Sequence, residues 1–225
     1  MHNIIRQLLD WSEVWAFLIP VPFMLIHKKH AGYLKPVRIY IWIAIVLTLA
    51  INIIWKFKED FGLQKGDFWW SNNFLYNIHS IFRFVLFSWF FILLKQPFLQ
   101  QIKRIISLLF IVFVLVNFIL LEDFFYYNSF SSRLLSVETA ILLLLCLQYY
   151  FFILREDMSA ERRPPSFWVV TGLSVYAVIN FPIFLFYSAF YKEFENFAIQ
   201  IWDVTNLSLV IFCIFLARAF YISKH

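Results

Sequence analysis

Two side chains that can carry a positive charge lie one helical turn apart in an apolar segment, Asn73 to Lys95. They are His79 and Arg83. An arginine that faces lipid at mid-membrane costs roughly 2.5–3.5 kcal/mol on insertion scales, so its helix face has to turn toward water or a counter-ion. At about 100° per residue, Tyr76 lies on the same face. The segment therefore predicts a buried polar site whose counter-ions come from other helices.

The carboxylates that could pair with Arg83 lie in other apolar segments. Glu13 stands near the start of the first segment, Glu138 near the start of the fifth and Asp203 within the last. Each is a candidate partner, and the pair Arg83 with Asp203 is the specific contact that we look for. With Asp10 included, four carboxylates accompany one arginine, which leaves an acidic surplus. Either some of these groups are protonated, or the pocket is wet and open to the outside.

Asparagines extend this polar set. Asn206 shares a helix face with Asp203, and Asn180 lies in the sixth apolar segment. Simpler roles stay open: Arg83 could fix helix registry, His79 could be a hydrogen-bonded core residue, and Asn180 could join two helices. The predicted ligand-binding residues are Glu13, Tyr76, His79, Arg83, Glu138, Asn180, Asp203 and Asn206.

The composition predicts an integral membrane protein in a lipid bilayer. Hydrophobic residues make up 62% of the chain and charged residues 15%, whereas soluble domains carry roughly 25% charged residues. The net charge of +5 comes from basic residues in short connections at helix ends, where membrane topology explains them. Because no basic patch with a nucleic-acid-reading motif is present, we expect no nucleic-acid partner.

Enzyme chemistry finds little support in the sequence. A zinc hydrolase needs several ligands at the right spacing, but His79 is the only histidine within an apolar segment. A haem site built on a helix pair needs a second buried histidine. Cys146 and Cys213 lie in apolar runs and form no disulfide or metal pattern. We therefore expect no catalytic site, no metal and no cofactor.

The apolar runs set the fold class. They reach the roughly 20 residues needed to cross about 30 Å of hydrocarbon. In the first run, Asp10 and Glu13 could lie in the headgroup region of a tilted helix. Pro20, Pro22 and Pro182 release backbone carbonyls and kink or loosen their helices. The sequence predicts an all-α single domain, residues 1–225, of seven transmembrane helices at about 8–26, 37–55, 73–95, 102–121, 133–154, 166–190 and 196–222.

The basic residues predict the orientation of these spans. With the N-terminus outside, twelve Lys and Arg residues fall in the inner connections and six in the outer ones. Cytoplasmic connections carry the excess of Lys and Arg, so we expect an N-out, C-in protein of a bacterial-type inner (plasma) membrane. Under this topology, the polar side chains of the predicted pocket all lie in the outer half of the bilayer.

The chain also carries the pattern of an internal repeat. Aligning Asn73 with Asn196 places Arg83 on Asn206, and spans one to three then match spans five to seven around a linker span. Such a parallel three-plus-one-plus-three arrangement has a pseudo-twofold axis along the membrane normal. In topology and length it resembles the SWEET sugar transporters and the rhodopsins. The proline-glutamine signature of the former is missing, and no lysine between Asn196 and Leu216 could form a retinal Schiff base.

These patterns favour a membrane sensor or signalling protein with a polar pocket open to the extracytoplasmic side. A small extracytoplasmic ligand or a proton would bias the bundle, and the inner connections would relay the change. The connection Arg155 to Pro165 has mixed charges and could dock a cytoplasmic or membrane protein partner. The alternatives are a small-solute or proton-coupled transporter and a structural subunit of a membrane complex.

Overall fold

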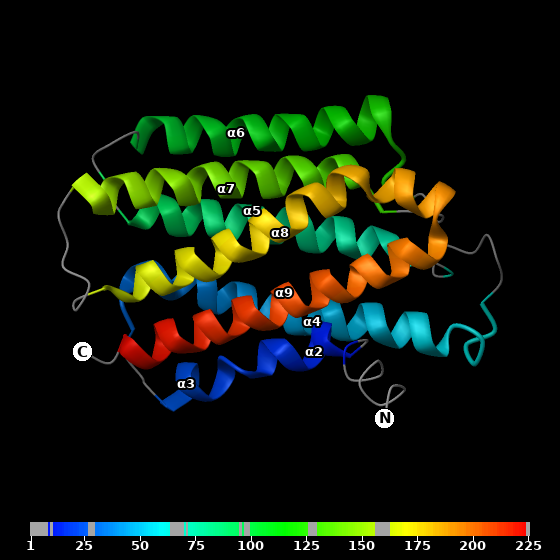
Figure 1. Cartoon of the computed structure of the whole chain (residues 1–225), viewed down its shortest axis with the longest axis horizontal. Helices are drawn as coiled ribbons and strands as arrows, with labels where there is room; N and C mark the ends of the chain where they lie inside the picture. Colours follow the sequence, from blue (N-terminus) through cyan, green and yellow to red (C-terminus); the bar gives the residue numbers. More distant parts are fainter. Residues whose placement is uncertain are drawn as a thin grey trace.

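A computed structural model of the chain is all-helical over the residues that it describes (Figure 1). These are residues 9, 11–26, 30–63, 70, 72–94, 96, 100–125, 130–155 and 163–223. Six helices in this part of the chain are long and apolar enough to cross a membrane. The all-α fold class is thus confirmed, and the six apolar helices indicate a membrane protein.

The six long helices follow the predicted apolar runs closely. The fourth predicted span is helix α6, which ends in a π-helical turn, Asn117–Leu121. The helices are α4 (Lys35–Phe57), α5 (Asn73–Leu93), α6 (Gln100–Val116), α7 (Ser132–Arg155), α8 (Pro165–Glu193) and α9 (Glu195–Ile222). At 1.5 Å per residue, helices of this length match the thickness of a bilayer core.

The first predicted span is a broken segment, and the count of seven spanning helices is not confirmed. It consists of α2 (Ser12–Trp15), a 3-10 turn (Ala16–Leu18) and α3 (Val21–Ile26), too short together to count with the six spanning helices. Pro20 has no backbone N–H, so the helical ladder stops there and resumes when Met24 N–H bonds to Pro20 O at 3.0 Å. We call residues 12–26 the N-terminal segment.

The helices form a bundle with α6 at one edge and the N-terminal segment at the other (Figure 1). Helix α5 packs against α4, α6 and α7, and α9 packs against α8 and the N-terminal segment. Aromatic side chains fill the core, with Phe87, Phe90, Phe212 and Phe220 fully buried. The apolar side chains of α6 are mostly exposed, as expected of a helix that faces lipid.

Helices α8 and α9 approach each other closely at Gly172. A Cβ atom at this position would lie 2.6 Å from the Cβ of Phe215 and 3.2 Å from the carbonyl oxygen of Phe212. Any side chain there would push the two helices apart. The glycine thus sets the distance between the helices that carry Tyr176 and Trp202.

The predicted three-plus-one-plus-three repeat is not confirmed. Its first element would match the N-terminal segment to α7, but α7 is a continuous helix of 24 residues, whereas the N-terminal segment breaks at Pro20. Helix α6, the predicted linker, lies at an edge of the bundle (Figure 1). The two halves therefore differ in the element that would have to begin each repeat.

Candidate functional site

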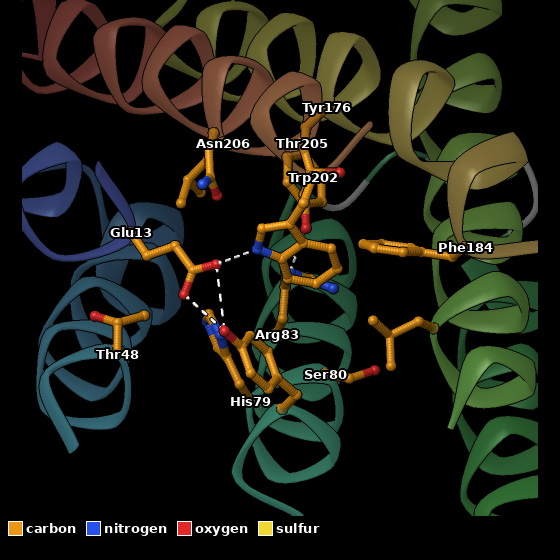
Figure 2. Close-up of a pocket in the computed structure, with 13 residues that line it drawn as sticks. Glu13, Thr48, His79, Ser80, Arg83, Tyr176, Phe184, Trp202, Thr205 and Asn206 are labelled. Carbon is orange, nitrogen blue, oxygen red and sulfur yellow. Dashed lines mark hydrogen bonds between the residues drawn. The ribbon is translucent and has the colours of Figure 1, made fainter. Parts of the chain in front are cut away.

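A small cavity lies where the N-terminal segment, α4, α5, α7, α8 and α9 meet (Figure 2). Its volume is about 40 Å³, enough for about three water molecules at roughly 10–15 Å³ each. Most of the side chains come from the first halves of α5, α7 and α9 and from Thr48 and Phe184 in the later halves of α4 and α8, whereas Arg83, Tyr176 and Leu209 lie near the middle of their helices, so the polar groups gather in one half of the bundle. The lining residues are Glu13, Thr48, Tyr76, His79, Ser80, Arg83, Leu135, Tyr176, Phe184, Trp202, Thr205, Asn206 and Leu209.

Helix α5 supplies the largest polar face of the cavity. Tyr76, His79, Ser80 and Arg83 follow one another at spacings of three, one and three residues, which brings them to one side of a helix with 3.6 residues per turn. All four line the cavity. The helical periodicity therefore predicted this face correctly.

Arg83 forms a buried ion pair with Glu138 of α7. Its Nε atom lies 2.5 Å from Glu138 Oε1, and its Nη2 atom lies 2.7 Å from Oε2. Nη1 donates to the hydroxyl of Tyr176 at 2.6 Å, and Ser80 donates to Glu138 Oε2 at 2.5 Å. The specific pairing of Arg83 with Asp203 was wrong, because α5 packs against α7, whereas Asp203 lies on α9.

This cluster fixes three helices to one another. Arg83 and Glu138 are 4% and 0% exposed, and the bidentate geometry is the strong form of an arginine–carboxylate contact. Both carboxylate oxygens and three guanidinium nitrogens already have protein partners. The cluster is therefore suited to holding α5, α7 and α8 in register, and its charges compensate each other.

Glu13 is held differently, by uncharged donors only. Its Oε2 accepts a hydrogen bond from the Tyr76 hydroxyl at 3.1 Å, and its Oε1 accepts one from Trp202 Nε1 at 3.0 Å. Among the described residues, no cationic side chain forms an ion pair with this carboxyl group, which is buried. Glu13 thereby connects the N-terminal segment to both α5 and α9 (Figure 2). A headgroup position at the protein surface does not fit this burial.

His79 lines the cavity and also packs into the core. Its Nε2 atom lies 3.3 Å from the hydroxyl of Tyr40 on α4. The imidazole stacks on the Tyr40 ring and meets the edge of Phe17. This is the arrangement of a hydrogen-bonded core histidine that has one side on a polar space.

The predicted asparagines have separate roles. Asn206 lines the cavity, and its Nδ2 donates to the carbonyl of Leu9 at 3.2 Å. Asn180 donates to Ser208 Oγ at 2.7 Å and to the carbonyl of Tyr176, so it joins α8 to α9 and does not line the cavity.

Of the two aspartates in the predicted polar set, only Asp203 belongs to the described residues. Asp203 is half-buried on α9 and is not part of the cavity wall. Asp10 lies outside the described residues, as does most of the charged connection 155–165. The acidic surplus at the cavity therefore comes from Glu13.

Three aromatic residues that line the cavity were not predicted from the sequence, namely Tyr176, Phe184 and Trp202, and two of them lie close to predicted residues. Tyr176 stands four residues before Asn180, and Trp202 stands four residues before Asn206. Each thus occupies the helix face of a residue that was already singled out. Extending those faces by one turn would have found both.

The cavity does not have the composition of a metal centre. Among the described residues, no group of three or more His, Cys, Asp or Glu side chains could hold a metal ion. Its polar groups are the Glu13 carboxyl, which has no cationic partner among the described residues, the guanidinium of Arg83 in its pair with Glu138, the imidazole of His79, the indole N–H of Trp202, hydroxyls and an amide. Such a set can exchange a proton or hydrogen-bond a small polar molecule.

Comparisons of the chain with protein-family models, with curated proteins and with solved structures give no match. The resemblance to the SWEET transporters and rhodopsins rested on seven spans and a repeat, neither of which is confirmed, and it carries no further argument. The function has to be inferred from the cavity and its connections.

Proposed function

We propose that this protein is an integral membrane sensor or signalling protein whose input is the Glu13 carboxyl group. The observation that carries the proposal is that Glu13 connects the broken N-terminal segment to α5 and α9 through Tyr76 and Trp202, without a cationic partner among the described residues. Burying a charge without a counter-ion costs free energy, so protonation of the Glu13 carboxyl or binding of a ligand to it strongly changes the free energy of the conformation in which it is buried. The N-terminal segment is the element that responds.

The surroundings of Glu13 favour this carboxyl as the group that changes its charge state. The titratable groups near it on α5 are Tyr76, His79 and Arg83, and Arg83 is already neutralised by Glu138. At the cavity, α9 contributes Trp202, Thr205 and Asn206, and α4 contributes Thr48, none of which is charged. The nearest acidic group along α9 is Asp203, outside the cavity wall.

The position of the cavity supports an input from the outer side. Most of its lining side chains lie in the half of the bundle away from the connections that hold most of the Lys and Arg residues. With the N-terminus outside and the C-terminus in the cytoplasm of a bacterial-type cell, the cavity belongs to the extracytoplasmic half. The ligand would then be a small extracytoplasmic molecule or a proton.

The N-terminal segment offers a route for the output. It begins near Glu13 and ends at Ile26, near the far end of α9, where Phe23 and Tyr221 pack edge to face at 6.0 Å. Beyond it, His30 bonds to Ser223 Oγ at 2.9 Å and to the carbonyl of Met24 at 3.0 Å. A shift of the segment at Glu13 would thus reach the cytoplasmic end.

Transport is the weaker candidate for two physical reasons. The cavity of about 40 Å³ is far below the roughly 300–1,000 Å³ of sites for drug-sized molecules. Beneath the Arg83 layer, the fully buried rings of Phe87, Phe90 and Phe212 fill the core, whereas alternating access needs a path to the second side. These features favour sensing by a bundle that stays closed.

The proposal is tested by the distance between two nitroxide labels at the cytoplasmic end. Ile26→Cys and Leu154→Cys place them on the N-terminal segment and on α7, at positions that are 68% and 76% exposed. Cys146 and Cys213 are buried and are replaced by alanine. In nanodiscs, pulsed electron paramagnetic resonance then measures the distance between pH 5 and pH 8.

We expect the distance distribution to change with pH in the parent protein and to stay fixed in Glu13→Gln, which mimics the protonated carboxyl. Asp123→Asn is the matched control, because Asp123 is an exposed acid near the same end of the bundle. It should keep the parent response. If the parent protein and Glu13→Gln show the same distance distribution at every pH, the proposal is refuted. A separate assay, solute uptake into proteoliposomes, would favour transport if the uptake depends on Glu13.

A further inference from the structure

We infer that the cavity binds a small ammonium-type cation, ammonium or methylammonium, with the Glu13 carboxylate as its counter-ion. The inference rests on the proposed function and names the ligand class of the same site. It draws on three features of the cavity: its charge, its unpartnered oxygen atoms and its aromatic walls. Its volume then limits the size of the ligand.

The charge of the cavity calls for a single cation. Arg83 and Glu138 compensate each other in a bidentate pair, so neither attracts a further ion strongly. Glu13 accepts only uncharged donors, and its negative charge is uncompensated among the described residues. A monovalent cation beside Glu13 would remove the free-energy cost of burying an uncompensated negative charge, whereas an anion would add to that cost.

Two oxygen atoms on α9 supply further ligands. Thr205 Oγ1 and Asn206 Oδ1 are buried and have no hydrogen-bond partner among the described residues, and both residues line the cavity. Asn206 is 3% exposed, and Figure 2 shows it extending from α9 toward the space beside the Glu13 carboxyl. Buried polar atoms are almost always hydrogen-bonded, so unpartnered acceptors around a cavity point to a donor that fills it. An ammonium group brings only donors.

Aromatic side chains form the remaining walls. Tyr76, Phe184 and Trp202 line the cavity, and Trp202 packs against Tyr76 at 5.7 Å and against Phe130 at 5.4 Å between ring centroids. The negative face of an aromatic ring attracts a cation, and tryptophan does so best. A carboxylate next to such rings suits an organic ammonium ion better than a strongly hydrated alkali ion. A divalent ion would need more carboxylates than this cavity offers.

The volume sets an upper limit on the ligand. About 40 Å³ accommodates about three atoms of the size of a water molecule. Ammonium and methylammonium fall within this limit. Tetramethylammonium exceeds it and also lacks N–H groups for the acceptors on Thr205 and Asn206. Comparing methylammonium with tetramethylammonium therefore distinguishes a site that fits a small ammonium ion from a general attraction of cations to the protein.

The test is the thermal unfolding of the full chain in nanodiscs, at fixed pH and ionic strength, with ammonium, methylammonium, tetramethylammonium or sodium chloride. We expect ammonium and methylammonium to raise Tm in a saturable manner and the other two salts to leave it unchanged. Glu13→Gln should abolish the rise, and Asp123→Asn should retain it. Equal stabilisation by sodium chloride, or an undiminished rise in Glu13→Gln, would overturn the inference.

A second variant covers the case in which Glu13→Gln fails to fold. Thr205→Val keeps the shape of the side chain and removes an oxygen that has no partner in the described structure. It should fold as the parent does and bind methylammonium several-fold more weakly by calorimetry; unchanged binding would count against the site. If methylammonium has no effect while the label distance still responds to pH, the inference fails and the proposed function stands. If neither responds, both fail.

Discussion

Removal of Glu138 should be among the most damaging single changes in the protein. Glu138→Ala leaves Arg83 Nε, Arg83 Nη2 and Ser80 Oγ without their acceptor, and the guanidinium is then buried without a counter-ion. Breaking a buried ion pair by removing one partner typically costs about 3–5 kcal/mol. Arg83→Met should cost a similar amount, because Glu138 is then the uncompensated charge.

The double variant Arg83→Met with Glu138→Leu removes both charges together. Replacing a whole buried pair by apolar residues of similar volume is often neutral or stabilising by about 1–4 kcal/mol. Two hydroxyls, those of Tyr176 and Ser80, lose a partner in this variant. We therefore expect the double variant to be clearly more stable than either single variant.

Equilibrium unfolding in mixed detergent micelles measures these differences as a double-mutant cycle. The matched control is the pair Arg133 with Glu122, which lies 3.6 Å apart with side chains 59% and 26% exposed. Exposed pairs contribute at most about 1 kcal/mol, so its cycle should show little coupling. Strict additivity in the Arg83 and Glu138 cycle would refute the view that these two residues act as one buried, mutually compensating unit.

Two further changes test the packing around the cavity. Gly172→Ala should destabilise the fold by about 1–3 kcal/mol through overpacking, because the new Cβ would lie 2.6 Å from Phe215 Cβ. The control is Gly32→Ala, because a Cβ at Gly32 has nothing within 4 Å. Equal destabilisation by the two substitutions would contradict the close approach of α8 and α9. Tyr76→Phe removes a hydrogen bond to Glu13 and should cost about 1.5–3 kcal/mol if that carboxyl is charged, whereas Tyr191→Phe at an exposed position should be near neutral. A thermal shift of the same size in both tyrosine variants would argue against the Glu13 contact.

The positions of the long helices could be predicted from the sequence because length and apolarity determine which segments fit a bilayer. The predicted start at residue 73 is the observed start of α5, and α7 and α8 begin within one residue of the predicted positions. The N-terminal segment was predicted as a span on apolar length. The structure breaks this segment at Pro20, whose missing N–H interrupts the helical hydrogen bonds as expected of a proline within a helix, and a crossing of the membrane by this segment is not confirmed.

The polar face of α5 could also be predicted, because it depends only on helical periodicity. The partner of Arg83 could not, because it depends on which helices become neighbours. Glu138 and Asp203 were both candidates, and the packing of α5 against α7 selected Glu138. Arg83 was expected to bind a ligand; it lines the cavity, and its charge is compensated by Glu138, whereas Glu13 has no cationic partner among the described residues.

The role of Glu13 as the input is tested by the label distance between positions 26 and 154 in nanodiscs, measured at pH 5 and pH 8 in the parent protein and in Glu13→Gln. We expect two different distance distributions for the parent protein, and we expect the distribution at pH 5 to match that of Glu13→Gln at both pH values. Identical distributions in all four measurements would show that the state of the Glu13 carboxyl does not reach the far end of the bundle, and would contradict its role as the input of a sensor.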